Sequence, residues 1–337
     1  MTRAAAEPSP LGLLAEGRAA LRAAGLADAR QSAEWLLAAV IGGGRFGAYL
    51  EPSRALSRDQ VHRYRGLVDR RAAREPLQHL VGAEDFAGVR LAVTSDVLIP
   101  RPETEGLVEW AAEILAERPG ALVADIGTGS GAIACALARR VPDARVVAVD
   151  CSEAALAVAR RNVEALQLGD RIALFAGDLL APLRTLGLAR DLIVANLPYL
   201  PSRIIPSLPA EVSVWEPRIA LDGGPDGLSL LRRIVIEAAI ALSIGGWLLV
   251  EVGEEQSAPV AGLMTEAGFI DIECRRDLNG VERHVGGRWA RDPDRALFRS
   301  PDCDRASGAG EPLTPTFESG EARDPRPSGG EGGPRAR

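Results

Sequence analysis

The stretch that decides the fold runs from residue 121 to residue 131 and reads Ala-Leu-Val-Ala-Asp-Ile-Gly-Thr-Gly-Ser-Gly. It begins as a short apolar strand, continues as a glycine-rich turn, and is followed by an apolar helical segment, residues 132–138. Glycines let a backbone turn sharply and approach a bound cofactor closely, with a helix N-terminus behind the turn. The stretch therefore predicts a site for a nucleotide-like cofactor in an α/β domain.

The spacing of these glycines and two acidic residues indicate which cofactor binds. The spacing is G-x-G-x-G, one residue short of the dinucleotide-binding spacing. Asp125 precedes the glycines and would repel a pyrophosphate, but it can accept hydrogen bonds from the amino group of a methionine moiety. Asp150 ends the next apolar run and can accept both ribose hydroxyls. These features predict S-adenosylmethionine, which contains ribose and adenine but no phosphate.

A second motif, Asn196-Leu197-Pro198-Tyr199, follows the apolar run of residues 192–195. Open α/β sheets bind their ligands at the carboxyl ends of the strands. The Asn196 side-chain oxygen and the Leu197 carbonyl can each accept one N–H of a planar NH2 group. Pro198 would fix the turn, and Tyr199 would cover the flat face of that group. Taken alone, the four residues also fit a plain turn that ends a strand.

Asp178 and Leu179 follow the third expected strand, where they can meet the adenine amino group and ring, although a generic turn aspartate is the alternative. The expected cofactor-binding residues are Asp125, Gly127, Thr128, Gly129, Ser130, Gly131, Asp150, Asp178, Leu179 and Asn196. The expected substrate-binding residues are Asn196, Leu197, Pro198 and Tyr199, of which Asn196 and Tyr199 are the catalytic candidates. Glu216 and Asp222 are expected to shape a loop near the substrate entrance and not to form a catalytic acid pair.

These motifs together resemble the release factor glutamine methyltransferase family (HemK/PrmC), over roughly residues 75–290. Further resemblance lies in five segments: residues 98–105, residues 216–217, residues 220–228, residues 245–256 and residues 277–283. The family tetrapeptide usually reads Asn-Pro-Pro-Tyr, so Leu197 is a departure. The contact that the family makes at this position is a backbone carbonyl, which leucine also supplies.

The resemblance implies an α/β fold, a seven-stranded S-adenosylmethionine-dependent methyltransferase (Rossmann-like) domain with a small N-terminal helical domain. It implies a protein-glutamine N-methyltransferase that modifies the glutamine of the Gly-Gly-Gln motif in class I peptide chain release factors. One alternative is methylation of adenine or another exocyclic amine on RNA or DNA, since Asn-Leu-Pro-Tyr also resembles adenine dimethyltransferases of ribosomal RNA. Another is a catalytically silent adaptor that binds the cofactor.

The apolar pattern divides the chain into four parts. Apolar residues at three- and four-residue spacings predict an N-terminal helical, substrate-docking domain, residues 1–78, followed by a hairpin linker, residues 79–100. Strands alternating with helices predict the methyltransferase domain, residues 101–291, with its last two strands antiparallel. Glycine and proline dominate residues 292–337, and we expect a disordered tail there.

Composition and charge bound the remaining possibilities. The net charge of -7 argues against stable nucleic-acid binding, and the chain has no apolar stretch of membrane-spanning length. Four cysteines without metal-like spacing fit a reducing cytoplasm and no metal site, with Cys135 and Cys274 in the core. Residues 1–80 nevertheless hold 12 arginines against 8 acidic residues. Their densest run, Arg63, Arg65, Arg70, Arg71 and Arg74, is either a solvated helix face or a docking surface.

Overall fold

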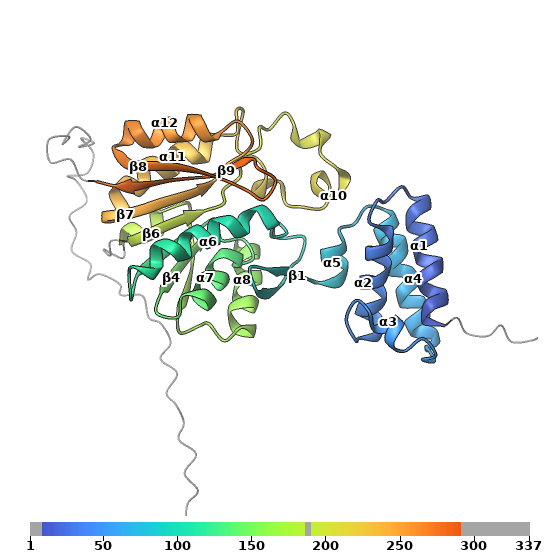
Figure 1. The fold of residues 1–337 in the computed structure, drawn as a ribbon. Helices are drawn as coiled ribbons and strands as arrows, with labels where there is room; N and C mark the ends of the chain where they lie inside the picture. The colour runs from blue at the N-terminus through green and yellow to red at the C-terminus, as the bar shows by residue number, and fades with distance from the viewer. Residues whose placement is uncertain (1–8, 186–189, 291–337) are drawn as a thin grey trace, which may run out of the picture.

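The computed structural model describes residues 9–185 and 190–290 of the 337-residue chain. These residues form a helical bundle at the N-terminal end, a short hairpin, and a larger part built on a β-sheet (Figure 1). The expected tail, residues 292–337, lies outside the described residues. In the described part of the chain, no helix combines the length and the hydropathy needed to cross a membrane.

The bundle consists of α1 (Pro10–Ala23), α2 (Ala29–Ile41), α3 (Gly47–Leu50), α4 (Arg58–Ala72) and α5 (Leu77–Val81). Local sequence fixes several ends of these helices. Ser57 and Gln60 form the predicted capping box at the start of α4, each bonding the other's backbone N–H. Gly42, with a φ of 77°, ends α2. The bundle core is a cluster of leucine side chains around the fully buried ring of Tyr64.

The predicted hairpin consists of β1 (Ala83–Phe86) and β2 (Val89–Ala92), joined by a turn at Ala87 and Gly88. It packs against α7 (Ala132–Arg140) and α8 (Glu153–Ala165) of the sheet part. The Asn162 side chain fixes the hairpin there, because it bonds both the N–H and the carbonyl of Ala92. The same amide also donates to the Ser130 carbonyl of the glycine turn. The hairpin thus supports the predicted cofactor site as well as linking the two parts.

The sheet part contains seven strands in the order β5-β4-β3-β6-β7-β9-β8. The first five strands in this order are parallel, and the last two strands along the chain pair antiparallel, as predicted. The strands are β3 (Leu122–Ile126), β4 (Arg145–Asp150), β5 (Ile172–Ala176), β6 (Arg190–Ala195), β7 (Leu242–Glu251), β8 (Phe269–Arg276) and β9 (Glu282–Trp289). The described helices are α6 (Pro102–Ala116), α7 (Ala132–Arg140), α8 (Glu153–Ala165), α9 (Ala181–Thr185), α10 (Ala210–Ser213), α11 (Ser229–Ala241) and α12 (Ser257–Ala267), with 3-10 turns at Ile205–Ser207 and Arg218–Ala220.

Each face of the sheet has its own apolar core. Val123 and Val146 point to the face covered by α6, α7, α8 and the hairpin. Ala124 and Val147 point to the opposite face, covered by α11 and α12. Strands buried on both faces read as continuous apolar runs, as the sequence shows for residues 121–124 and 146–149. Cys135 lies in the first core as predicted.

One core prediction is wrong. Cys274 is exposed, because it lies on β8, which forms an edge of the sheet. Most side chains of this strand are at least partly accessible. The short apolar run at residues 269–272 indicated a strand but not its position at the edge.

The arginine run is divided between the surface and internal contacts: Arg63, Arg65 and Arg70 are exposed on α4, as expected for a solvated face, and docking stays a prediction. Arg65 pairs with Glu16 of α1, and Arg70 pairs with Glu75. The Arg71 side chain is 7% exposed and reaches Glu211 of α10, and Arg74 reaches the same carboxylate. Much of the run therefore holds the bundle together and links it to the sheet part, where α10 faces the bundle (Figure 1).

Candidate active site

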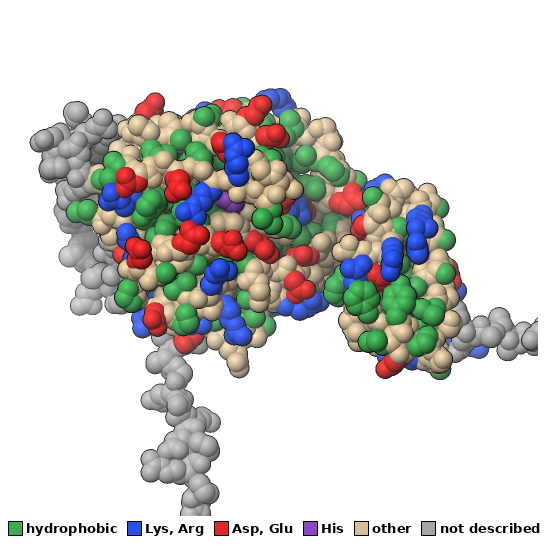
Figure 2. Space-filling view, in the orientation of Figure 1, with side chains coloured by type: hydrophobic (Ala, Val, Ile, Leu, Met, Phe, Trp, Pro, Cys, Tyr) green, Lys and Arg blue, Asp and Glu red, His purple; other side chains and the backbone are tan. Residues whose placement is uncertain are grey.

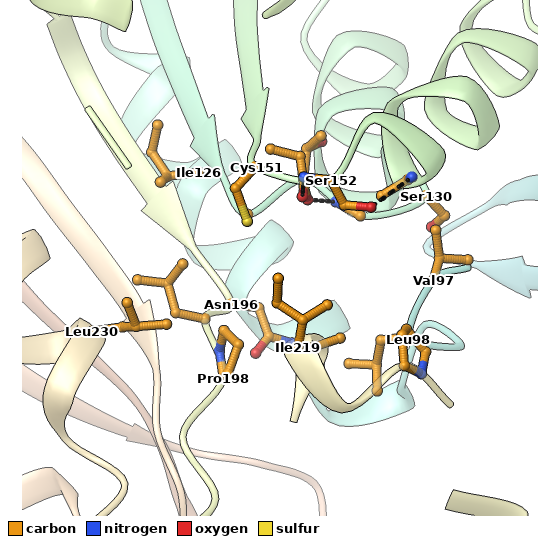
Figure 3. Close-up of a pocket in the computed structure, with 18 of the residues that line it drawn as sticks. Val97, Leu98, Ile126, Ser130, Cys151, Ser152, Asn196, Pro198, Ile219 and Leu230 are labelled. Carbon is orange, nitrogen blue, oxygen red and sulfur yellow. Dashed lines mark hydrogen bonds between the residues drawn. The ribbon is translucent and has the colours of Figure 1, made fainter. Parts of the chain in front are cut away.

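A cavity of about 780 Å³ lies at the carboxyl ends of β3, β4 and β6. This volume is in the range of small-molecule and cofactor sites. Figure 3 shows Ser130 and Ser152 on one side of it and Asn196 and Pro198 on the other, with Val97 and Leu98 beside them. Ten of the thirteen residues expected to bind the cofactor or the substrate line the cavity: Gly127, Thr128, Gly129, Ser130, Asp150, Asp178, Leu179, Asn196, Leu197 and Pro198. Asp125, Gly131 and Tyr199 do not line it.

The glycine turn has a backbone that other residues adopt only under strain. Gly127, Gly129 and Gly131 have φ values of 74°, 56° and 78°. A Cβ on Gly127 would lie 2.9 Å from the Leu197 side chain. Gly131 faces α8 instead of the cavity, and a Cβ there would lie 3.3 Å from that of Ala159. Gly127 therefore allows the tetrapeptide to approach the turn, whereas Gly131 allows close packing of a helix.

The expected contact between Asp125 and the cofactor stays a prediction. The Asp125 side chain is completely buried below the turn, where one oxygen accepts the Thr128 hydroxyl at 2.6 Å and the Ala134 N–H at 3.1 Å. Burial raises the pKa of this carboxyl to about 7. The other carboxylate oxygen is also buried and has no hydrogen-bond partner among the described residues. The two hydrogen bonds that Asp125 accepts hold the glycine turn in shape.

Asp150 ends β4 and lies at the cavity wall. Its two carboxylate oxygens accept the backbone N–H groups of Gly129, at 2.8 Å, and Ser152, at 2.9 Å. Each oxygen keeps a further lone pair for another donor. A carboxylate held in place with two free acceptor positions fits the neighbouring hydroxyls of a ribose.

Asp178 and Leu179 lie at the rim beyond β5. Leu179 is buried, has a φ of 47° and lines the cavity. The Asp178 carboxylate is largely exposed and pairs with Arg233 of α11 at 2.7 Å. The cavity thus offers an apolar contact for a ring beside a polar rim.

Asn196 follows β6 and points into the cavity (Figure 3). Its side-chain Nδ2 donates to the Thr104 hydroxyl at 3.0 Å, and this hydroxyl donates to the buried Glu251 carboxylate at 2.6 Å. Thr104 also lines the cavity from the first turn of α6. Because the amide nitrogen has a partner behind it, the side-chain oxygen is the group that Asn196 offers to a ligand.

Tyr199 lies elsewhere than expected. Its ring packs in the core between the sheet and α11 and α12, and its hydroxyl donates to Glu251 at 3.1 Å. Its carbonyl accepts the Gln256 side chain at 2.9 Å. Burial and the Glu251 charge raise the pKa of the Tyr199 hydroxyl. The ring does not line the cavity, and its expected role against a planar group stays a prediction.

The loop between β6 and α11 forms one wall of the cavity, through residues 217–220 and 222–224. Glu216 is buried and accepts hydrogen bonds from the Ile99 N–H and from Arg101, which ties the loop to the segment before α6. Burial raises the pKa of Glu216. Asp222 accepts from Gly224 and Arg218 and holds the turn beside Pro198. These contacts match the loop-shaping role expected for the two acids.

Sequence reasoning missed several residues of the site. Val97 and Leu98 line the cavity from the segment after the hairpin, and Ile219 lines it from the loop between β6 and α11. Thr104 and Glu251 connect Asn196 to the core. The sequence did contain a signal for Thr104 and Glu251, since both lie in segments that resemble the family, residues 98–105 and 245–256. It did not show that the two residues contact each other.

The fold and this site define a class of protein, the methyltransferases that use S-adenosylmethionine. Residues 123–213 match the family model described as a methyltransferase domain, and residues 12–82 match the one described as the PrmC N-terminal domain. The hMettl16 catalytic domain, crystallised with a 3'UTR hairpin, has a similar fold, with a TM-score of 0.51, 17% identity, and coverage of 68% of this chain and 82% of that one.

Two relatives identify the family within this class of methyltransferases. The release factor glutamine methyltransferase of Geobacter sulfurreducens is 47% identical over 78% of this chain and 91% of that protein. That of Caulobacter vibrioides is 38% identical over 79% and 92%. The chain belongs to the release factor glutamine methyltransferase family. The match of residues 12–82 extends the resemblance into the bundle, beyond the residues on which the sequence motifs lie.

Proposed function

We propose that this methyltransferase transfers a methyl group from S-adenosylmethionine to the glutamine side-chain nitrogen in the Gly-Gly-Gln motif of class I release factors. The observation that carries the proposal is the position of Asn196. Its acceptor oxygen faces the same cavity as the glycine turn and Asp150. A target amide and a cofactor can therefore share this cavity. The relatives described above carry the glutamine methyltransferase name, and neither alternative activity is favoured.

The reaction needs positioning more than it needs a strong base. An amide nitrogen is a poor nucleophile because its lone pair is delocalised into the carbonyl. The Asn196 oxygen and the Leu197 carbonyl would accept its two N–H groups and favour a pyramidal nitrogen with a directed lone pair. S-adenosylmethionine supplies a methyl group on a positively charged sulfur. Ordering the two reactants in one cavity can contribute roughly 7–11 kcal/mol to lowering the barrier.

We also propose a separate role for each of three parts of the chain. Residues 101–291 would carry the chemistry, residues 79–100 would link the parts, and residues 1–78 would dock the release factor. Figure 2 shows hydrophobic side chains gathered on the bundle over α3, with arginines above them. Phe46 is 56% exposed and Leu50 is 77% exposed. Such a patch supports docking of a protein surface. Because release factors act on ribosomes, we place the reaction in the cytoplasm.

Mass spectrometry of a release factor after incubation with the protein and labelled S-adenosylmethionine tests the proposal. We expect one labelled methyl group on the glutamine of the Gly-Gly-Gln motif. A release factor whose glutamine is replaced by alanine is the control and should stay unlabelled. An adenine-containing RNA incubated in parallel should stay unlabelled too. Label on the RNA and none on the release factor would contradict the proposed substrate.

A further inference from the structure

We propose that Thr104 and Glu251 are positioning residues that determine which end of the Asn196 amide faces the substrate. The inference rests on the proposed function, since it concerns the same transfer. The two residues come from different elements, the first turn of α6 and the end of β7. They lie 92 and 55 positions from Asn196 in the chain, and the fold brings all three together.

The count of protons in this chain of hydrogen bonds fixes its direction. Glu251 is 1% exposed, and in its ionised form, which prevails above about pH 7, it can only accept hydrogen bonds. A threonine hydroxyl has one proton, and Thr104 gives that proton to Glu251 at 2.6 Å. The Thr104 oxygen can then only accept from Asn196, so the asparagine must present its NH2 group to Thr104 and its oxygen to the cavity.

The opposite orientation would defeat the proposed chemistry. An asparagine amide has nearly the same shape when rotated by half a turn, so packing alone hardly distinguishes its two ends. In the rotated form, its NH2 group would meet the N–H groups of the target amide, donor against donor. The carboxylate of Glu251, acting through the Thr104 hydroxyl, excludes the rotated orientation of the Asn196 amide.

The other oxygen of Glu251 has its own donor, which keeps the carboxylate in place. Tyr199 donates to it at 3.1 Å, and the backbone of Tyr199 is held in turn by Gln256. The tyrosine of the tetrapeptide thus acts from behind the site. It serves the same network as Asn196, three residues before it, without contacting the substrate.

Thr104→Val tests the inference, because valine keeps the shape of threonine and removes the hydroxyl. We expect the kcat for release factor methylation to fall by about ten- to a hundredfold, with the dissociation constant of S-adenosylmethionine changed by less than about threefold. Thr104→Ser, which keeps the hydroxyl, should restore most of the rate. Equal rates for the valine and serine variants would overturn the inference, whether both are fast or both are slow.

Glu251→Gln and the double variant test whether Glu251 acts through Thr104. A glutamine can donate to Thr104 as well as accept from it, so the direction is no longer fixed, and we expect kcat to fall by several fold. In the Thr104→Val background the same change should have no further effect on kcat. Additive losses would overturn the pathway. Wild-type protein that fails to methylate a release factor would instead contradict the proposed function itself.

Discussion

The Thr104 hydroxyl links Asn196 to Glu251, but the two side chains lie in different surroundings. Asn196 is partly accessible and faces the cavity, whereas Glu251 is a carboxyl in an apolar core. Burial raises the pKa of Glu251 to about 7, against the hydrogen bonds from Thr104 and Tyr199 and the charge of Arg283, which lower it. The protein therefore maintains at neutral pH a group whose charged form is costly.

This cost predicts how stability depends on pH. Below its ordinary pKa of 4.5, Glu251 is protonated in both the folded and the unfolded chain. Between about pH 4.5 and 7 the folded chain retains a proton that the unfolded chain has lost, so the free energy of unfolding decreases as pH rises, by roughly 3 kcal/mol in total. Above pH 7 this contribution is constant.

Urea denaturation of wild type and Glu251→Gln from pH 4 to 8 measures the effect. The difference in free energy of unfolding between the two proteins should change by a few kcal/mol in favour of the glutamine variant as pH rises, and then level off. Asp125, whose pKa is also about 7, contributes to both proteins and cancels in the difference. A difference that stays constant over this range would show that Glu251 titrates normally.

Leu197 offers a second test at this scale. Its side chain is buried against the glycine turn, but its proposed contact with the substrate is made by its backbone carbonyl. Leu197→Pro keeps that carbonyl, and we expect single-turnover methyl transfer to remain within about threefold of wild type. Leu197→Ala is the matched variant that removes the same packing without proline. A large loss with proline and none with alanine would argue against the backbone contact.

The role of a residue could be predicted from the sequence when it depends on neighbours along the chain, but not when it depends on contacts with distant residues. Asp150 and Asn196 directly follow apolar runs, so their place at strand ends could be predicted. Asp125 and Tyr199 were also near strand ends, but strands buried on both faces give no alternation from which to tell where a side chain points. Thr104 and Glu251 meet across 147 positions, which no local pattern encodes.

At the scale of elements, the loop between β6 and α11 was the least predictable part of the site. Its apolar residues follow neither helical nor strand spacing, and its position depends on glycines that allow two backbones to touch. Gly223 bonds the Leu200 carbonyl, and a Cβ on it would lie 2.7 Å from the Pro198 carbonyl oxygen. The strands and the longer helices, by contrast, follow from apolar runs and caps.

Gly227 makes this close approach testable. It has a φ of 80°, and a Cβ on it would lie 2.2 Å from the Tyr199 carbonyl oxygen. Gly280 has a φ of 81° and open space around it. Both changes to alanine should destabilise the protein by about 1 kcal/mol through backbone strain. Gly227→Ala alone should also displace the tetrapeptide and slow methyl transfer by about tenfold or more, measured in single turnover. Equal activities would contradict this role of the loop.

At the scale of the whole molecule, charge links the bundle to the site. Glu211 of α10 accepts from Arg71 at 3.2 Å and from Arg74 at 3.3 Å, and the loop that carries α10 continues to the cavity wall. The sequence indicated both the helical bundle and the arginines, but not that the arginines would be used internally. A run of charged residues can pair with many different groups. Which groups it pairs with is decided by the folded structure and not by the local sequence.

Glu211→Ala tests this link. The bundle should then be held less firmly against the sheet part, and the KM for the release factor should rise by roughly three- to tenfold, since an ion pair of this kind contributes about 1 kcal/mol. The kcat and the affinity for S-adenosylmethionine should stay close to wild type. Glu211→Gln, which keeps a hydrogen-bond acceptor, should show a smaller effect. An unchanged KM would mean that the ion pairs do not influence docking.

The central claim is that Asn196 holds the target amide while the methyl group moves, and single-turnover methyl transfer to a release factor tests it most directly. Asn196→Ala should lower the rate on the order of a hundredfold or more, as for other positioned transition-state partners, and calorimetry should show that much of the affinity for S-adenosylmethionine remains. Asn279→Ala, the same change in an exposed turn, should transfer the methyl group at the wild-type rate. An Asn196→Ala protein that methylates the release factor as fast as wild type would contradict the account.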